Sequence, residues 1–122
     1  MNIVLWILQI LTAFAFVVHA RLMFAPDSPQ ARMMPYIGAI PAPFRQAIGV
    51  AEALGGLSLI LPALTRILPW LTPVAASGLA IVLAAAIVFH IQRREGQNIV
   101  LNLILLVISV VIASRRFILA PL

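Results

Sequence analysis

The chain of 122 residues has the length of a single domain. Hydrophobic residues make up 64% of it and charged residues only 9%, whereas about a quarter of the residues in a soluble domain are charged. This composition excludes a soluble globular protein and predicts an integral membrane protein. The absence of cysteine excludes disulfides, thiol redox centres and metal sites with cysteine ligands.

The net charge of +5 comes from arginines, since the chain has no lysine. These arginines lie at the ends of apolar segments and in the links between them, where guanidinium groups can contact lipid phosphates. They do not form a basic patch interleaved with aromatic residues. We therefore expect the lipid bilayer, and not nucleic acid, to be the partner of this charge.

Four apolar segments follow one another along the chain, and each approaches or reaches the roughly 17–25 residues that a spanning helix needs. They cover about residues 3–24, 44–61, 74–91 and 98–114. All nine prolines fall outside these four segments, so we expect none inside a span. The pattern predicts an all-α, up-down-up-down transmembrane four-helix bundle, a single domain over residues 1–122, with both termini on the same side.

The link after the first segment differs from the others. The first segment itself lacks the preceding basic residue of a signal peptide, so we expect it to be a retained span. The link, residues 25–43, contains five prolines and an apolar middle that includes Met33, Tyr36 and Ile37. We expect it to lie along the membrane interface or to form an ordered loop.

The second segment carries a carboxylate, Glu52. It lies about nine residues into the helix, which places it roughly 12–14 Å below the membrane surface. A charge at that depth costs several kcal/mol unless it is paired, hydrated or protonated. Gly49 and Gly56 lie on the same helical face, so a neighbouring helix can come close and surround the acid. We expect any function to centre on Glu52.

Spans that run alternately up and down place further polar residues in the same leaflet as Glu52. They lie near the first and third links, and we take them as candidate ligand-binding or proton-relay residues: His19, Arg21, Arg45, His90, Asn98 and Asn102. Polar stripes on the first and fourth spans should face inward, because lipid offers them no hydrogen bonds. Together these residues predict a polar pocket that opens toward one membrane surface.

Two interpretations of Glu52 follow. In the functional one, Glu52 is the central acid of a pocket that binds a ligand headgroup or relays protons. In the structural one, Glu52 pairs with an arginine and the polar stripes only fix helix packing. Carboxylates buried in membranes mark functional sites by default, so we favour the pocket.

The two histidines raise sharper hypotheses. His19 and His90 could ligate a haem from both faces, or could form a metal site together with Glu52. His90 borders Gln92 and Arg93, however, which favours an interfacial residue bonded to water or headgroups. Glu52 is also placed too deep to join the histidines. We therefore expect neither haem nor a metal, and a quinone remains the cofactor to consider.

Rows of small residues mark the second and third spans. We interpret them as seams of helix packing, within the chain or between copies, and not as ligand sites; the residues concerned are Gly49, Gly55, Gly56, Ala80 and Ala84. The sequence holds no nucleophile elbow, phosphate-binding loop, zinc spacing or dinucleotide fingerprint. It therefore names no catalytic residue and does not indicate a self-contained enzyme.

The second span contains the motif Gly-x-x-Glu-x-x-Gly-Gly at residues 49–56, followed by Leu-Pro at 61–62. The third span ends in FHIQRREGQ, residues 89–97, a histidine followed by a basic turn and a glutamate. These motifs resemble the DoxX-like family of small membrane proteins, and the resemblance extends over nearly the whole chain. Where relatives often close the first helix with glycine and lysine, this chain has VHARLM, with Arg21 in place of the lysine.

The resemblance implies a multi-pass four-helix bundle in a bacterial cytoplasmic (inner) membrane. Family members are tied to quinone-linked oxidation of sulfur compounds and to membrane oxidoreductase complexes, and distant eukaryotic relatives look like receptor-assembly chaperones. We therefore expect an auxiliary membrane subunit that binds a quinone or lipid around Glu52 and supports an oxidoreductase partner. The alternatives are a structural or assembly protein that docks other membrane helices or copies of itself without a ligand, and a small proton-coupled carrier.

Overall fold

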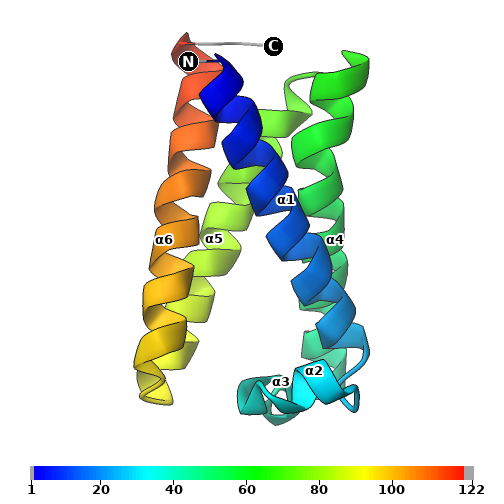
Figure 1. Ribbon diagram of the computed structural model, residues 1–122, viewed down its shortest axis with the longest axis vertical. Coiled ribbons are helices and arrows are strands. Elements are labelled where there is room, and N and C mark those ends of the chain that lie inside the picture. The colour runs from blue at the N-terminus through cyan, green and yellow to red at the C-terminus, as the bar shows by residue number, and fades with distance from the viewer. Residues whose placement is uncertain (1, 120–122) are drawn as a thin grey trace.

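The computed structural model describes residues 2–119 as an all-α bundle (Figure 1). Within these residues the long helices are α1 (Asn2–Phe24), α4 (Ala42–Thr65), α5 (Leu71–Gln92) and α6 (Gly96–Ser114). Two short helices, α2 (Pro29–Arg32) and α3 (Pro35–Ala39), lie between α1 and α4, and a π-helix, η1 (Arg115–Leu119), continues α6. The long helices run alternately up and down, and the start of α1 lies at the same end of the bundle as η1 (Figure 1).

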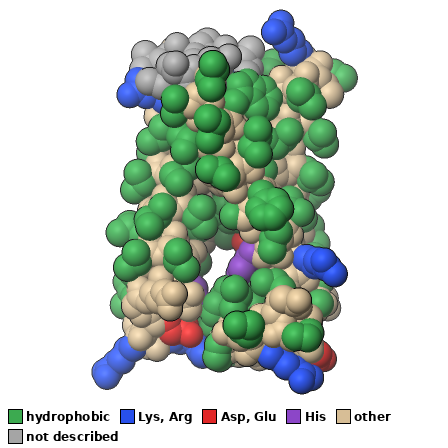
Figure 2. Space-filling model, viewed as in Figure 1, with side chains coloured by type: hydrophobic (Ala, Val, Ile, Leu, Met, Phe, Trp, Pro, Cys, Tyr) green, Lys and Arg blue, Asp and Glu red, His purple; other side chains and the backbone are tan. Residues whose placement is uncertain are grey.

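The surface of the bundle is suited to lipid. Each of the four long helices within residues 2–119 is long and apolar enough to cross a membrane. Large apolar side chains point outward along these helices, and they cover most of the face seen in Figure 2, with charged groups toward the ends. Helices also satisfy their own backbone hydrogen bonds, as hydrocarbon requires. The expected all-α membrane bundle is confirmed.

The bundle consists of two helix pairs. α1 packs along α4, and α5 packs along α6, whereas α1 and α6 meet only briefly. The apolar core between the pairs includes Phe16, Leu59 and Leu79. Figure 1 shows α1 inclined across the bundle, so that the pairs diverge toward the end that carries α2 and α3. The functional residues described below come from this end.

Pro62 lies inside α4, contrary to the expectation that every proline falls outside the spans. A proline cannot donate to the carbonyl four residues earlier, here that of Ser58. The Oγ1 hydroxyl of Thr72 in α5 donates to this carbonyl oxygen at 3.1 Å. The next carbonyl, that of Leu59, accepts from Nε2 of Gln9 in α1 at 2.7 Å. Because side chains of both neighbouring helices satisfy the backbone here, α4 continues past the proline.

The link between α1 and α4 folds into two short helices that the sequence did not predict. Each begins with a proline, whose fixed φ suits the first helical position. The hydroxyl of Ser28 caps α2 by accepting from the N–H of Ala31 at 3.3 Å. Tyr36 and Ile37 of α3 are buried in one cluster with Met23 of α1. The link therefore closes one end of the bundle, and helices this short leave no periodic signal in the sequence.

Glycines of α4 determine how closely its neighbours approach. A Cβ atom at Gly56 would lie 3.2 Å from the carbonyl oxygen of Ala13 in α1, and one at Gly49 would lie 2.9 Å from an aromatic ring at the end of α1. A Cβ atom at Gly55 would lie 2.7 Å from the side chain of Leu79 in α5. These close approaches support the packing role proposed for the three glycines.

We expect Gly56→Leu to destabilise the bundle, because its side chain would meet the backbone of α1. Overpacking of this kind costs about 1–3 kcal/mol, and it should lower the midpoint of thermal unfolding in detergent micelles followed by circular dichroism. Gly78→Leu is the matched control, since a Cβ atom at Gly78 meets nothing within 4 Å. Equal midpoints for the two variants would contradict the close approach of α1 and α4.

Candidate functional site

A cavity of about 540 Å³ lies between the two helix pairs, next to the end that α3 closes. Figure 2 shows a hollow in the lower half of the visible face, with histidine and acidic side chains at its wall. The lining comes from every long helix and is mostly apolar. Its polar and titratable side chains are His19, Tyr36, Glu52, His90, Asn98 and Asn102. Five residues of the expected constellation, Glu52, His19, His90, Asn98 and Asn102, therefore share one cavity.

Glu52 is buried in the cavity wall, with 4% of its surface exposed. Nδ1 of His19, on α1, lies 2.9 Å from each of the two carboxylate oxygens. The imidazole therefore donates to the carboxylate, and the two groups form an ion pair when His19 is protonated. His19 is itself half-buried, and its loss would leave the buried carboxyl group of Glu52 without this hydrogen-bond partner, which is unfavourable in an apolar surrounding.

Tyr36 joins this pair from α3. Its hydroxyl lies 2.7 Å from Nε2 of His19, so both ring nitrogens of His19 are engaged. The Tyr36 ring stacks near the His19 ring, with centroids 6.0 Å apart, and meets the His90 ring edge to face at 4.7 Å. Tyr36 is itself 7% exposed. A residue from the link thus completes a polar cluster that α1 and α4 begin.

His90, at the end of α5, belongs to a second pair. It is buried, with 3% of its surface exposed, and lines the cavity. Its Nδ1 lies 2.8 Å from Oε1 of Glu95 in the turn before α6. Nε of Arg93 donates to the same oxygen at 3.1 Å. The carboxylate therefore fixes the orientation of His90 and leaves Nε2 of the ring for the cavity.

Asn102 lines the cavity from α6. Its Nδ2 donates to the carbonyl oxygen of Asn98, one turn earlier, at 2.7 Å. This bond leaves the Asn102 side-chain oxygen and its second N–H free to contact a molecule in the cavity. The polar stripe expected on the fourth span therefore does face inward at this end of the bundle.

The two arginines expected beside Glu52 lie elsewhere. Arg21 is exposed and does not line the cavity. Arg45 donates from Nε to the carbonyl oxygen of Met23 at 2.8 Å and from Nη1 to that of Ile40 at 3.2 Å. Within residues 2–119 the ion-pair partner of Glu52 is a histidine and not an arginine. Arg45 instead ties the ends of α1 and α3 to α4.

The depth estimate that separated Glu52 from both histidines was wrong for His19. It assumed upright helices, whereas α1 is inclined (Figure 1). The metal hypothesis still gains no support, because no group of three His, Asp or Glu side chains within the described residues is placed to hold an ion. Tyr36 contacts both imidazole rings, so these rings cannot bind one haem from its two faces.

Two titratable groups next to the cavity lie outside the spans and are shifted. Burial raises the pKa of Tyr36 to about 12, and the negative charges of Glu52 and Glu95 add to this effect. The hydrogen bond from His90, followed by the contact with Arg93, lowers the pKa of Glu95 below its ordinary value. At neutral pH Tyr36 is therefore a neutral hydrogen-bond donor and Glu95 a carboxylate.

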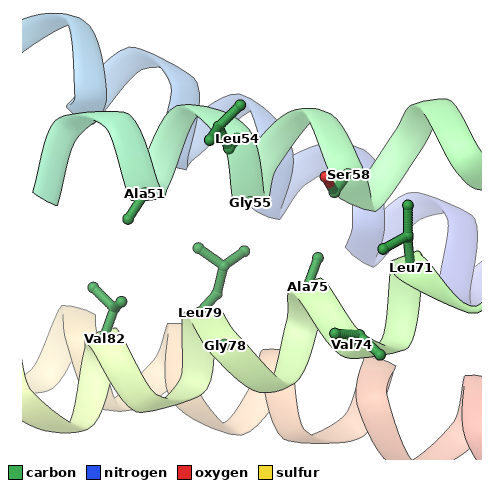
Figure 3. Close-up of a pocket in the computed structure, with 10 residues that line it drawn as sticks. All are labelled: Ala51, Leu54, Gly55, Ser58, Leu71, Val74, Ala75, Gly78, Leu79 and Val82. Carbon is green, nitrogen blue, oxygen red and sulfur yellow. The ribbon is translucent and has the colours of Figure 1, made fainter. Parts of the chain in front are cut away.

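A smaller hollow of about 310 Å³ lies between α4 and α5 (Figure 3). Its lining is apolar apart from Ser58, and Gly55 and Gly78 face each other across it. In the small-residue row of α5, Ala80 is half-buried and Ala84 is exposed. A seam between copies at these two alanines stays a prediction.

A bundle of four spanning helices, with a polar cluster buried beside the glycines of α4, defines a small multi-pass membrane protein. The sequence profile of the DoxX-like family matches residues 7–112. The chain belongs to this family. No curated protein and no solved structure gives a significant match. His19, Tyr36, Glu52, His90 and Glu95 all lie within the matched range.

Sequence reasoning missed Tyr36 and Glu95 as site residues. Tyr36 is the single tyrosine of the chain and carries a hydroxyl within an otherwise apolar stretch, which is a weak signal. Glu95 stands five residues after His90, a spacing that no helical face explains because the helix ends between them. Tyr36 reaches the cavity from a short helix of the link, and Glu95 reaches His90 from the turn before α6; the apolar pattern determines the path of neither segment.

We expect the hydroxyl of Tyr36 to ionise near pH 12, not near its ordinary value of 10.0. Because Tyr36 is the single tyrosine, the near-ultraviolet absorbance of tyrosinate reports it alone. A raised pKa means that the folded state binds this proton more tightly. The resulting stabilisation is present below pH 10 and is lost between about pH 10 and pH 12.

Glu52→Gln should move the Tyr36 midpoint toward its ordinary value without reaching it, because burial is the larger cause. Asp27→Asn removes an exposed carboxylate near the same end of the bundle and should leave the midpoint unchanged. A wild-type midpoint at or below 10 would mean that Tyr36 is exposed to water and not bonded to His19.

Proposed function

We propose that this DoxX-like protein is an auxiliary membrane subunit that binds a quinone or a similar amphipathic lipid by its headgroup. One observation carries the proposal: a mostly apolar cavity among the four long helices has the hydrogen-bonded pair of buried Glu52 and half-buried His19 in its wall. Its volume of about 540 Å³ falls within the range of about 300–1,000 Å³ that is usual for small-molecule sites.

The polar groups suit both redox forms of a quinone headgroup. A quinone carbonyl accepts hydrogen bonds, and Asn102 has a second N–H in the cavity lining beside the one bonded to Asn98. A quinol hydroxyl donates, and Glu52 and Nε2 of His90 can accept. Aromatic and aliphatic side chains around them, such as Phe16 and Phe89, suit the ring and the start of an isoprenoid or acyl tail.

The chain itself has no cysteine and no recognisable catalytic motif. We therefore assign electron transfer to a partner oxidoreductase and assign binding and placement of the headgroup to this chain. This proposal places the protein in a bacterial cytoplasmic membrane with both termini on one side. In this proposal the partner oxidoreductase determines the direction of electron flow.

The hollow between α4 and α5 supports a second candidate function. It is apolar and edged by small residues, and a Cβ atom added at Gly78 would meet no neighbouring atom within 4 Å. Small residues on a lipid-facing helix permit another helix to approach closely. The competing function is therefore a structural or assembly protein that docks membrane helices and needs no ligand.

We expect the protein, purified in mild detergent, to retain quinone or lipid in stoichiometric amount, as measured by mass spectrometry of an organic extract. Glu52→Gln should weaken retention about ten- to a hundredfold, because a hydrogen bond to a charged group contributes about 1.5–3 kcal/mol. Native mass spectrometry of the same sample reports both subunits and bound small molecules.

Asp27→Asn is the matched control, since it makes the same chemical change at an exposed position outside the cavity. It should retain as much ligand as the wild type. An empty wild-type extract with co-purified membrane proteins would favour the docking function. Equal retention by wild type and Glu52→Gln would remove Glu52 from the site.

A further inference from the structure

Five side chains form a row from the cavity to the membrane-surface end of the bundle. The row begins at the buried carboxylate of Glu52 and ends at the half-buried carboxylate of Glu95; in order, it consists of Glu52, His19, Tyr36, His90 and Glu95. Its members come from α4, α1, α3, α5 and the turn before α6. The row therefore exists only because five separate segments meet at this end.

We propose that this row carries protons between the membrane surface at Glu95 and the headgroup site at Glu52. The inference rests on the proposed function in one respect, since the bound headgroup is what would use or release the proton. The row has a histidine–carboxylate pair at each end and a tyrosine between the two pairs, and each of these side chains can both give up and accept a proton.

Three of the contacts already have hydrogen-bond geometry. Nδ1 of His19 lies 2.9 Å from the Glu52 carboxylate, the Tyr36 hydroxyl lies 2.7 Å from Nε2 of His19, and Nδ1 of His90 lies 2.8 Å from Glu95. The Tyr36 and His90 rings touch edge to face at 4.7 Å, and no hydrogen bond joins them within the described residues. Both residues line the cavity, so a water molecule or a headgroup oxygen there can bridge them.

One passage of a proton can be written with no change of oxidation state. A proton taken up by Glu95 at the membrane surface passes to Nδ1 of His90, and Nε2 of His90 gives its own proton to the bridging oxygen. That oxygen passes a proton to Tyr36 while Tyr36 passes its own to Nε2 of His19, and Nδ1 of His19 protonates Glu52. The net change is one proton moved from Glu95 to Glu52, and the reverse passage restores the start.

The surrounding charges determine how Tyr36 takes part in the relay. Tyr36 never becomes a free tyrosinate near neutral pH, because burial and the two carboxylates keep it protonated; it must accept a proton as it gives one. Around Glu95 the titratable and charged neighbours are His90 and Arg93 of α5 and Tyr36 of α3. Around His19 they are Glu52 of α4 and Tyr36. Arg93 bonds Glu95 and so holds the surface end in place.

The test measures how fast the Nδ1 proton of His19 exchanges with water. The chain contains two histidines, so ¹⁵N-histidine labelling gives signals from two imidazole rings. The His90→Gln variant shows which of these signals belong to His19. At one neutral pH we expect Tyr36→Phe and Glu95→Gln each to slow the exchange about tenfold or more, a modest part of what a positioned proton-transfer group contributes. Tyr36→Phe keeps the ring and its contacts and removes only the hydroxyl.

Asp27→Asn is the control, since it removes a carboxylate outside the row, and it should exchange as the wild type does. Circular dichroism and thermal unfolding confirm that each variant is folded. Exchange that is unchanged in folded Tyr36→Phe and Glu95→Gln overturns the relay, because His19 would then exchange directly through the cavity. If Tyr36→Phe slows the exchange but Glu95→Gln does not, the part of the proposed path that leads to Glu95 is also overturned.

Ligand retention in the same samples separates this inference from the proposed function. Glu95→Gln should keep the bound quinone or lipid, because Glu95 does not line the cavity. A protein that holds no ligand but shows the expected slowing would keep the relay and lose the headgroup site. A protein that holds ligand but shows no slowing in the variants would keep the headgroup site and lose the relay.

Discussion

The contact between His19 and Glu52 is the interaction on which the rest of the site depends. A carboxylate inside an apolar bundle is costly, and lipid cannot stabilise it. His19 does so from α1, because the glycines of α4 let α1 come close enough for a 2.9 Å contact. The close packing of α1 on α4 and the inclination of α1 then open the space toward α5 and α6 in which the cavity lies.

Several polar side chains elsewhere in the bundle satisfy backbone carbonyls that would otherwise lack a partner. Thr72 and Gln9 satisfy the two carbonyls beside Pro62, so α4 keeps its length despite the proline. Arg45 satisfies carbonyls at the ends of α1 and α3, so the link stays closed over the bundle. These contacts hold the helices around the cavity in place.

Much of the fold was readable from the sequence, and less of the site. Four long apolar helices form over the four apolar segments, because apolar length largely decides whether a helix can cross a bilayer. Glu52, His19, His90 and Asn102 were correctly placed near one another by the alternation of up and down helices. Arg21 and Arg45 were not, because the direction in which a long side chain leaves a helix end depends on the neighbouring carbonyls it finds. Tyr36 and Glu95 were missed, because turns set their positions.

The sequence by itself determined an all-α membrane bundle of the DoxX-like type and an acid at its centre, because hydrophobicity and the cost of a buried charge are local properties of the chain. Only the tertiary structure decided which group pairs with that acid. The partner is a histidine reached by an inclined α1, and the tyrosine beyond it comes from a link whose short helices leave no periodic pattern. Pairing between segments far apart in the chain depends on helix inclination and turn geometry, and the order of residues does not specify either one directly.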